Sequence, residues 1–386
     1  MKCMYLFFIF FIELNLINST LLFSYPTSVT LTNENILVVE KNGIYICDPT
    51  MEAIINTTFT FIEEDQIDND NKLANVEIKD KNNYIGVLVN FKLYLFTREG
   101  DLLKSTNRLI SDDNPTYFSF APIFVKSNNY YYVIAYFDSN VALKLVYFKI
   151  SLSGEHQNSQ IMTYKYEKFR GYLGKFKYEY KNEGLSCEYM LDDDSHKYNY
   201  FVCYLMIDDD GDISITQDFY EISESEISDY NQYKCTYIPI NNVKFIKTLT
   251  IKDIKRALVF VFSEENNMYR LNIYTYYYEF RATHLELLNS NYKCINDFSG
   301  IKTSYIYETD LLSFSCIGSG TEVQSILINN ALNIIQTNDQ FDTCDSIHGH
   351  SILYSQYYQK YYIISDALCY NNHLPFFPLR RNIKYN

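Results

Sequence analysis

The residues of this chain that could bind a metal lie in an acidic segment near its middle. Asp208, Asp210 and Asp212 alternate around Gly211. Alternating carboxylates beside a glycine suit calcium, which takes about six to eight oxygen ligands. The order differs from an EF-hand, because Gly211 precedes the third acid and no glutamate closes the loop. An ordinary acidic hairpin turn is the simpler interpretation. Calcium binding is the alternative. We expect the acids of 192–194 on a neighbouring turn, from which they could add further carboxylate ligands. No other cofactor is predicted.

The remaining chemical motifs are weaker. His348 and His350 lie near Cys344 and Asp345, but residues spaced by one point to opposite faces of a strand, which is poor geometry for a shared metal. We therefore expect a turn that leads into the last strand. The chain has no G-x-S-x-G nucleophile motif and no glycine-rich loop opening a helix. No catalytic residue is predicted.

Cysteine usage favours an oxidising compartment. The chain has nine cysteines, of which Cys3 would leave with a signal peptide, and the even remainder suggests disulfides. Eight cysteines allow roughly a hundred connectivities, so spacing supports only a preference. Three pairs close loops of similar size and the last follows by elimination: Cys187–Cys203, Cys294–Cys316, Cys344–Cys369 and Cys47–Cys235.

A modification motif points to the same compartment. Asn56-Thr57-Thr58 is a sequon for N-linked glycosylation, which in an exported protein marks a surface position. We expect Asn56 to be glycosylated on a surface turn.

The N-terminus has the pattern of a secretory signal peptide, assigned to residues 1–24. Lys2 precedes the apolar run Cys3–Ile12, and Ser19 and Ser24 offer cleavage points. The run is too short to span a bilayer, although a retained signal anchor is the alternative. No later segment reaches transmembrane length. The predicted location is secreted, extracellular or at the cell surface.

The segment that best shows the design of the chain is Tyr130–Ile150. Two aromatic and β-branched runs flank the polar tip Asp138-Ser139-Asn140, which is typical of a β-hairpin. Similar hairpins recur along the chain. Its 39 tyrosines and 27 phenylalanines favour pleated, half-buried strands, so the fold class is all-β.

The spacing of these hairpins predicts the architecture. About seven groups of strands occur at intervals of about 50 residues, close to the period of a β-propeller blade. We expect about seven four-stranded blades in residues 25–375 and a short C-terminal tail, 376–386. The last group is weak, so Ser28–Leu31 should pair with His350–Ser365 and close the ring with N- and C-terminal strands. Tandem β-sandwiches are the alternative.

Charge limits the partners. The net charge of −14 and the pI of about 4.9 disfavour nucleic acid and anionic membranes. Tyrosine clusters at Tyr130–Tyr132, Tyr274–Tyr278 and Tyr357–Tyr362 would place alternate members on opposite faces of a strand. Half of them are therefore expected in the core, and the other half can be exposed, where tyrosines suit protein or glycan contacts. Aromatic packing between blades is the simpler interpretation for any single tyrosine.

These observations predict a secreted, disulfide-stabilised, monomeric β-propeller that binds a protein or glycan and has no enzymatic activity. A secreted hydrolase or lyase with carboxylates at the propeller channel is the alternative. A third possibility is a structural ectodomain on an uncleaved N-terminal anchor. The sequence does not identify the partner. Its composition, typical of an AT-rich genome, favours a protist source.

Overall fold

Every regular element that the computed structural model describes is a β-strand. The described residues are 27–40, 43–49, 54–61, 76–81, 83–109, 117–126, 128–137, 143–152, 164–168, 185–191, 198–207, 213–222, 227–229, 238–239, 243–250, 256–265, 268–279, 282–294, 302–306, 311–317, 322–329, 334–340, 344–355, 360–369 and 376–378. The strands form seven antiparallel sheets. The all-β fold class is therefore confirmed.

The first three sheets each contain four strands that are consecutive along the chain. The first sheet contains β1 (Thr27–Thr30), β2 (Ile36–Glu40), β3 (Gly43–Cys47) and β4 (Ile54–Thr60). The second contains β5 (Val76–Lys81), β6 (Tyr84–Val89), β7 (Lys92–Thr97) and β8 (Leu102–Ser105). The third contains β9 (Tyr117–Lys126), β10 (Asn129–Phe137), β11 (Leu143–Ser151) and β12 (Tyr164–Lys168).

The later sheets repeat this order with small variations. The fourth contains β13 (Leu185–Leu191), β14 (Tyr198–Ile207), β15 (Ile213–Ile222), β16 (Ile227–Asp229) and β17 (Ile238–Pro239). The fifth contains β18 (Val243–Thr250), β19 (Arg256–Glu265), β20 (Met268–Glu279) and β21 (Ala282–Cys294). The sixth contains β22 (Lys302–Ile306), β23 (Leu311–Ile317), β24 (Glu322–Ile328) and β25 (Ile334–Gln340). The seventh contains β26 (Cys344–Ser355), β27 (Lys360–Cys369) and β28 (Phe376–Pro378).

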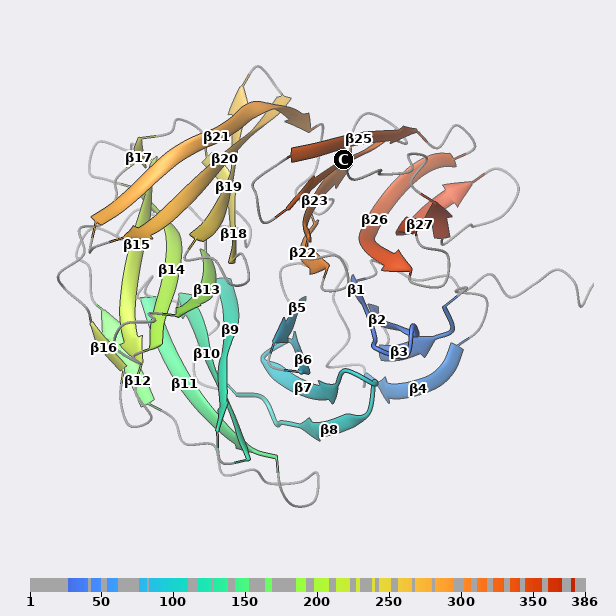
Figure 1. Ribbon diagram of the computed structural model, residues 1–386, viewed down its shortest axis with the longest axis horizontal. Coiled ribbons are helices and arrows are strands. Elements are labelled where there is room, and N and C mark those ends of the chain that lie inside the picture. Colours follow the sequence, from blue (N-terminus) through green and yellow to red (C-terminus); the bar gives the residue numbers. More distant parts are fainter. Residues whose placement is uncertain are drawn as a thin grey trace, which may run out of the picture.

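The sheets follow one another around a common centre (Figure 1). The first strand of each sheet contacts the first strand of the next, in the order β1, β5, β9, β13, β18, β22 and β26. β26 in turn contacts β1. A strand of the first sheet and a strand of the last sheet are therefore in contact.

The predicted pairing of the terminal strands is wrong. β1 pairs with β2 inside the first sheet, with Val29 opposite Leu37. A tight turn causes this, because the amide of Leu31 donates to the carbonyl of Asn35 at 2.8 Å and the chain folds straight back. The described part of the last sheet has three strands. Its third strand, β28, falls in the segment predicted as a tail and pairs with β27.

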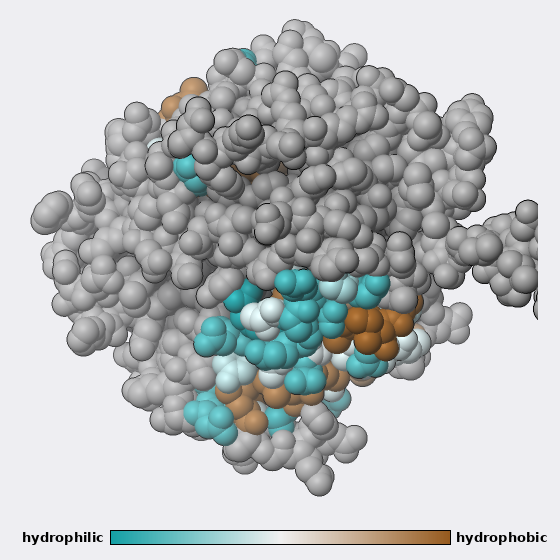
Figure 2. All heavy atoms as spheres, turned by 45° about the vertical axis from the view of Figure 1, so that its right-hand side comes forward, coloured by the Kyte–Doolittle hydropathy of each residue, from teal (hydrophilic) through white to brown (hydrophobic). Residues whose placement is uncertain are grey.

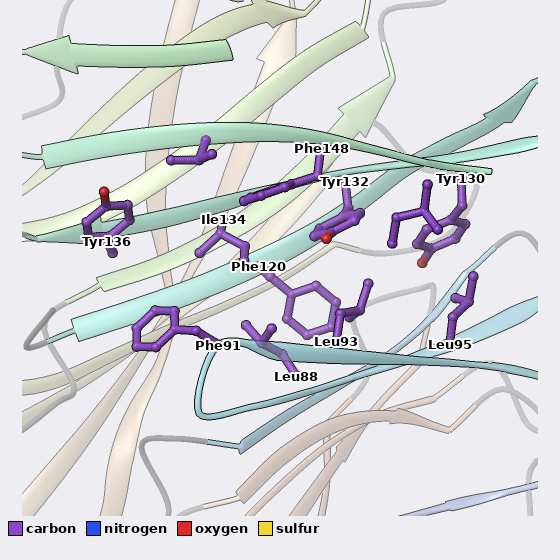
Figure 3. Packing of buried hydrophobic residues seen from close by; sticks show 12 residues of the cluster. Leu88, Phe91, Leu93, Leu95, Phe120, Tyr130, Tyr132, Ile134, Tyr136 and Phe148 are labelled. Carbon is purple, nitrogen blue, oxygen red and sulfur yellow. The ribbon is translucent and has the colours of Figure 1, made fainter. Parts of the chain in front are cut away.

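Two buried layers hold the first three sheets together, because strands β6 and β7 send alternate side chains to opposite faces. Ile85 and Val87 pack with the first sheet, whereas Leu88 packs with the third. Figure 3 shows the second layer, in which Leu88 and Leu93 lie opposite Phe120. The sequence pattern of the second sheet is thus apolar on both faces, as in strands sandwiched between neighbours.

Candidate binding surface

Two turns from neighbouring sheets meet where the first sheet packs on the second. The β1–β2 turn contains residues 31–35 and the β7–β8 turn contains residues 98–101; we call them the turn pair. The amide of Thr32 donates to the carbonyl of Arg98 at 2.9 Å, and the hydroxyl of Thr32 donates to the same oxygen at 3.2 Å. The side-chain amide of Asn33 donates to the carbonyl of Glu99 at 3.1 Å. These bonds lock the two turns in one relative position.

The β7–β8 turn is shaped by a threonine and a glycine. The hydroxyl of Thr97 accepts hydrogen bonds from the amides of Glu99 and Asp101, both at 3.2 Å. Gly100 has a φ of +99°, which side chains rarely adopt. A Cβ atom there would lie 2.7 Å from Cδ1 of Leu31 and 2.8 Å from Cδ1 of Ile46. The turn therefore needs glycine both for its backbone and for its contact with the first sheet.

The turn pair presents polar groups to solvent. Asn33, Glu99 and Asp101 are exposed, and Glu34 is partly exposed on a left-handed backbone with a φ of 70°. Their main chain is held by the hydrogen bonds above, so a partner that docks here meets a preformed surface. Carboxylates and a side-chain amide can accept hydrogen bonds and attract cationic groups.

A second exposed surface lies along β4, the outermost strand of the first sheet. Ile54 and Ile55 are 39% and 56% exposed, which is unusual for large apolar side chains. Register shifts leave Ile55 and Thr58 without opposite residues on β3, so the strand carries two bulges. Figure 2 brings this side forward and shows brown hydrophobic groups among teal hydrophilic ones.

The first tyrosine cluster does not contribute to a surface. Tyr130, Tyr131 and Tyr132 are 0%, 4% and 0% exposed, so this cluster follows the simpler interpretation, in which the rings pack between sheets. The reason is that the third sheet is covered on both faces. Tyr131 stacks on Tyr147 with ring centroids 5.7 Å apart, and Tyr132 stacks on Phe148 at 5.0 Å.

The other tyrosine clusters are described only in part. Tyr274 is partly buried, and burial raises its pKa although the Arg270 charge lowers it. The side chains of Tyr276–Tyr278 and Tyr357–Tyr362 lie outside the described set. Their exposure stays a prediction.

Other shifted pKa values also trace to burial. Burial raises the pKa of Cys47 to about 12, and the charge of Asp48 adds to the shift. Burial also raises the pKa of Tyr132, with a smaller contribution from Tyr130. The pKa of Tyr45 is raised first by burial and then by Glu40, to which its hydroxyl donates a hydrogen bond. These groups belong to the core and its margin.

Asp208, Asp210 and Asp212 lie outside the described residues, so calcium binding there stays a prediction. The acids of 192–194 also lie outside the described residues, and their predicted contribution to that site stays a prediction.

No group of three His, Cys, Asp or Glu residues is placed to hold a metal within the described part of the chain. His348 and His350 lie within β26, not on the expected turn. A register shift between Ile347 and Gly349 interrupts the pairing there. The turn prediction is wrong because the strand continues through this bulge.

The strand register bears differently on the predicted disulfides. Cys344 lies directly opposite Cys369, and opposite residues have Cβ atoms about 4.5–5.5 Å apart, near the disulfide range. Cys187 lies opposite Val202, and Cys203 lies opposite Ser186. Both bonds stay predictions.

The other predicted bonds have less support. Cys294 lies opposite Tyr269 in the fifth sheet, and Cys316 lies opposite Gln324 in the sixth. Cys47 is a free, buried thiol, which disagrees with the predicted bond to Cys235, a residue outside the described set. Asn56 lies on β4 and is exposed, but it is in a strand and not on the predicted turn.

The N-terminal segment assigned as a signal peptide lies outside the described residues. Within the described part, no helix has the length and apolarity needed to cross a membrane.

Comparisons with known proteins give similarity of structure alone. No family model matches the chain, and no curated protein matches it. The β-propeller domain of Vanderwaltozyma polyspora Nup133 is 11% identical with a TM-score of 0.47, over 92% of each chain. The Neurospora crassa Pan2 WD40 domain is 9% identical with a TM-score of 0.48, over 93% of this chain and 91% of that one.

A lectin, SapL1 in complex with alpha methyl fucoside, is 9% identical with a TM-score of 0.42. That match covers 83% of this chain and 97% of the lectin. All three TM-scores are below 0.5. The likeness to β-propellers therefore depends on the order of the sheets and on the contacts between them, and not on these matches.

Proposed function

We propose that the chain is an exported, seven-bladed β-propeller that acts as a monomeric, non-enzymatic binding module for a protein or glycan. The contact of β26 with β1 supports a closed ring. The apolar N-terminal segment supports export. The strand register, in which Cys344 lies opposite Cys369, supports a disulfide bond between these two residues.

The turn pair is the observation that carries the binding role. Thr32 and Asn33 fix it to the neighbouring sheet through main-chain oxygens of Arg98 and Glu99. A preformed surface avoids the free-energy cost of ordering loops on association. Because Glu99 and Asp101 are exposed there, we expect the partner to present cationic or hydrogen-bond-donating groups.

The test compares the exported chain with a Glu99→Lys, Asp101→Lys double variant, each immobilised and exposed to extracellular proteins and to a panel of neutral and acidic glycans. A single partner class should be retained by the wild type and lost at least tenfold in the variant. Thr57→Lys, which adds a charge on exposed β4, is the matched control and should bind as the wild type does. Retention that is unaffected by the double variant, or no retention by any form, would overturn the proposal.

A further inference from the structure

We infer that Asn56 carries an N-linked glycan and that this glycan shields the apolar outer edge of the first sheet. The inference rests on the export part of the proposed function, because the glycan is added in the secretory pathway. It concerns a different surface from the turn pair.

The position of Asn56 is the first observation. It lies in the exposed half of β4, between Ile55 and Thr57. Ile54 and Ile55 are 39% and 56% exposed, and the one other large apolar side chain exposed among the described residues is Leu287. The sequon therefore coincides with the main exposed apolar site of the described first sheet.

The chemistry of β4 is the second observation. Its sequence, IINTTFT, has no charged residue and no proline. Charged residues and prolines normally keep the edge of a sheet from pairing with other chains, so β4 lacks this protection. It is rich in β-branched residues, which favour strand pairing. The two bulges at Ile55 and Thr58 distort the edge, but they leave both isoleucines in solvent. A bulky, hydrated glycan at Asn56 would cover that edge.

The burial of Thr58 sets the order of events. Its hydroxyl is buried and makes no hydrogen bond to the described residues. A transferase that must recognise both Asn56 and Thr58 cannot reach this hydroxyl once β4 has packed on β3. The transfer must therefore precede folding of the first sheet, while the chain is being exported.

The reaction needs a lipid-pyrophosphate-linked oligosaccharide as co-reactant. The side-chain amide nitrogen of Asn56 attacks C1 of the first sugar, and a C–N bond forms while the bond from C1 to the phosphate oxygen breaks. The nitrogen loses one proton and the lipid pyrophosphate leaves with the bonding electron pair. No oxidation or reduction occurs.

Two neighbouring threonines provide a matched pair of variants. Thr58→Ala destroys the sequon and removes one methyl group and a hydroxyl without a described partner, so the fold should be retained. Thr57→Ala changes an exposed residue of the same strand and keeps the sequon. In a eukaryotic secretory host, the intact mass of wild type and Thr57→Ala should fall on treatment with a peptide N-glycosidase, whereas that of Thr58→Ala should not.

The shielding role is tested by light scattering over a range of protein concentrations. Asn56→Gln and Thr58→Ala should self-associate at least several-fold more strongly than Thr57→Ala. Adding Ile54→Thr and Ile55→Thr to Asn56→Gln should return the chain to the wild-type state.

An exported chain with unmodified Asn56 would overturn the inference and leave the proposed function standing. Modified protein whose Thr58→Ala variant associates no more strongly would overturn the shielding role. A chain that never leaves the cell would contradict the export part of the proposed function as well as this inference.

Discussion

Strands β10 and β4 show opposite relations between residue type and exposure. β10 carries three consecutive tyrosines, residues 130–132, each with a polar hydroxyl, and all three are at most 4% exposed. β4 carries Ile54 and Ile55, which are 39% and 56% exposed. Side-chain polarity alone would predict the reverse. The comparison teaches that the place of a strand within the stack of sheets decides burial here.

The contacts of the two strands explain the difference. β10 is an inner strand, paired with β9 and β11, and its sheet packs against the second sheet on one face and contacts β13 of the fourth on the other. β4 is the last strand in the order of the first sheet. Exposure falls from 39% at Ile54 to 0% at Cys47, which lies directly opposite it on β3. One strand of separation is enough to pass from surface to core.

The largest expected effect comes from truncating one residue in each strand. Tyr132→Ala should lower the free energy of unfolding by about 3–5 kcal/mol, because it leaves a cavity beside Phe148 and Phe120. Ile55→Ala should change it by less than about 0.5 kcal/mol. Urea unfolding of both variants measures the contrast, and similar losses in the two would contradict the assignment of core and edge.

The next effect tests the junction between the first and second sheets. Gly100→Ala should destabilise the chain by about 2 kcal/mol, because its backbone has a φ of +99° and the new Cβ would overlap Leu31 and Ile46. Thermal unfolding measures the loss. Glu99→Ala, at the exposed neighbouring position, is the control and should unfold close to the wild type.

The third prediction concerns Cys47, which is buried on β3 directly opposite the exposed Ile54 of β4. Its folded-state pKa of about 12 lies above the ordinary thiol pKa of 9.0, so above pH 9 the unfolded chain loses a proton that the folded chain keeps. Stability from this thiol is therefore complete below pH 9 and declines as the pH rises toward 12, by about 1.4 kcal/mol at pH 10.

The measurement is the difference in unfolding free energy between wild type and Cys47→Ala at pH 8 and pH 10. The difference should shrink at the higher pH. Native Cys47 should also resist alkylation until the chain is unfolded. A constant difference together with rapid native alkylation would show that the thiol is accessible.

The smallest effect concerns a hydroxyl inside the core. The hydroxyl of Tyr132 is buried and has no hydrogen-bond partner among the described residues. Tyr132→Phe should therefore leave stability unchanged or raise it by about 1 kcal/mol, since removing an unsatisfied polar group has no lost bond to offset it. A destabilised Tyr132→Phe, measured by urea unfolding beside Tyr132→Ala, would reveal a hydrogen bond to that hydroxyl.

Much of the local structure could be predicted. In the hairpin expected around 138–140, the two flanking strands are paired, with Phe137 opposite Leu143. Period-two alternation and turn residues are local signals that span only a few positions, so they can be recognised in the sequence. β28 was missed because three residues, Phe376–Pro378, are too short to show alternation.

The candidate surfaces could mostly not be predicted from the sequence pattern. Neither the turn pair nor the apolar edge of β4 has a motif, because Thr32 and Arg98 are 66 positions apart and meet only when the sheets stack. The sequon at Asn56 could be recognised in the sequence. Its position within a strand and the exposure of the neighbouring isoleucines could not. The pairing of β1 with β2 depended on a hydrogen-bonded turn at 31–35 that carries no glycine.

The amino-acid order by itself determined that this protein is built of antiparallel strands, since β-branched and aromatic runs favour strands and the short polar turns between them join neighbouring strands into hairpins. The tertiary structure alone decided which faces are covered, because coverage is supplied by sheets that are distant along the chain. That is why the tyrosines of β10 are core residues and the isoleucines of β4 are surface residues.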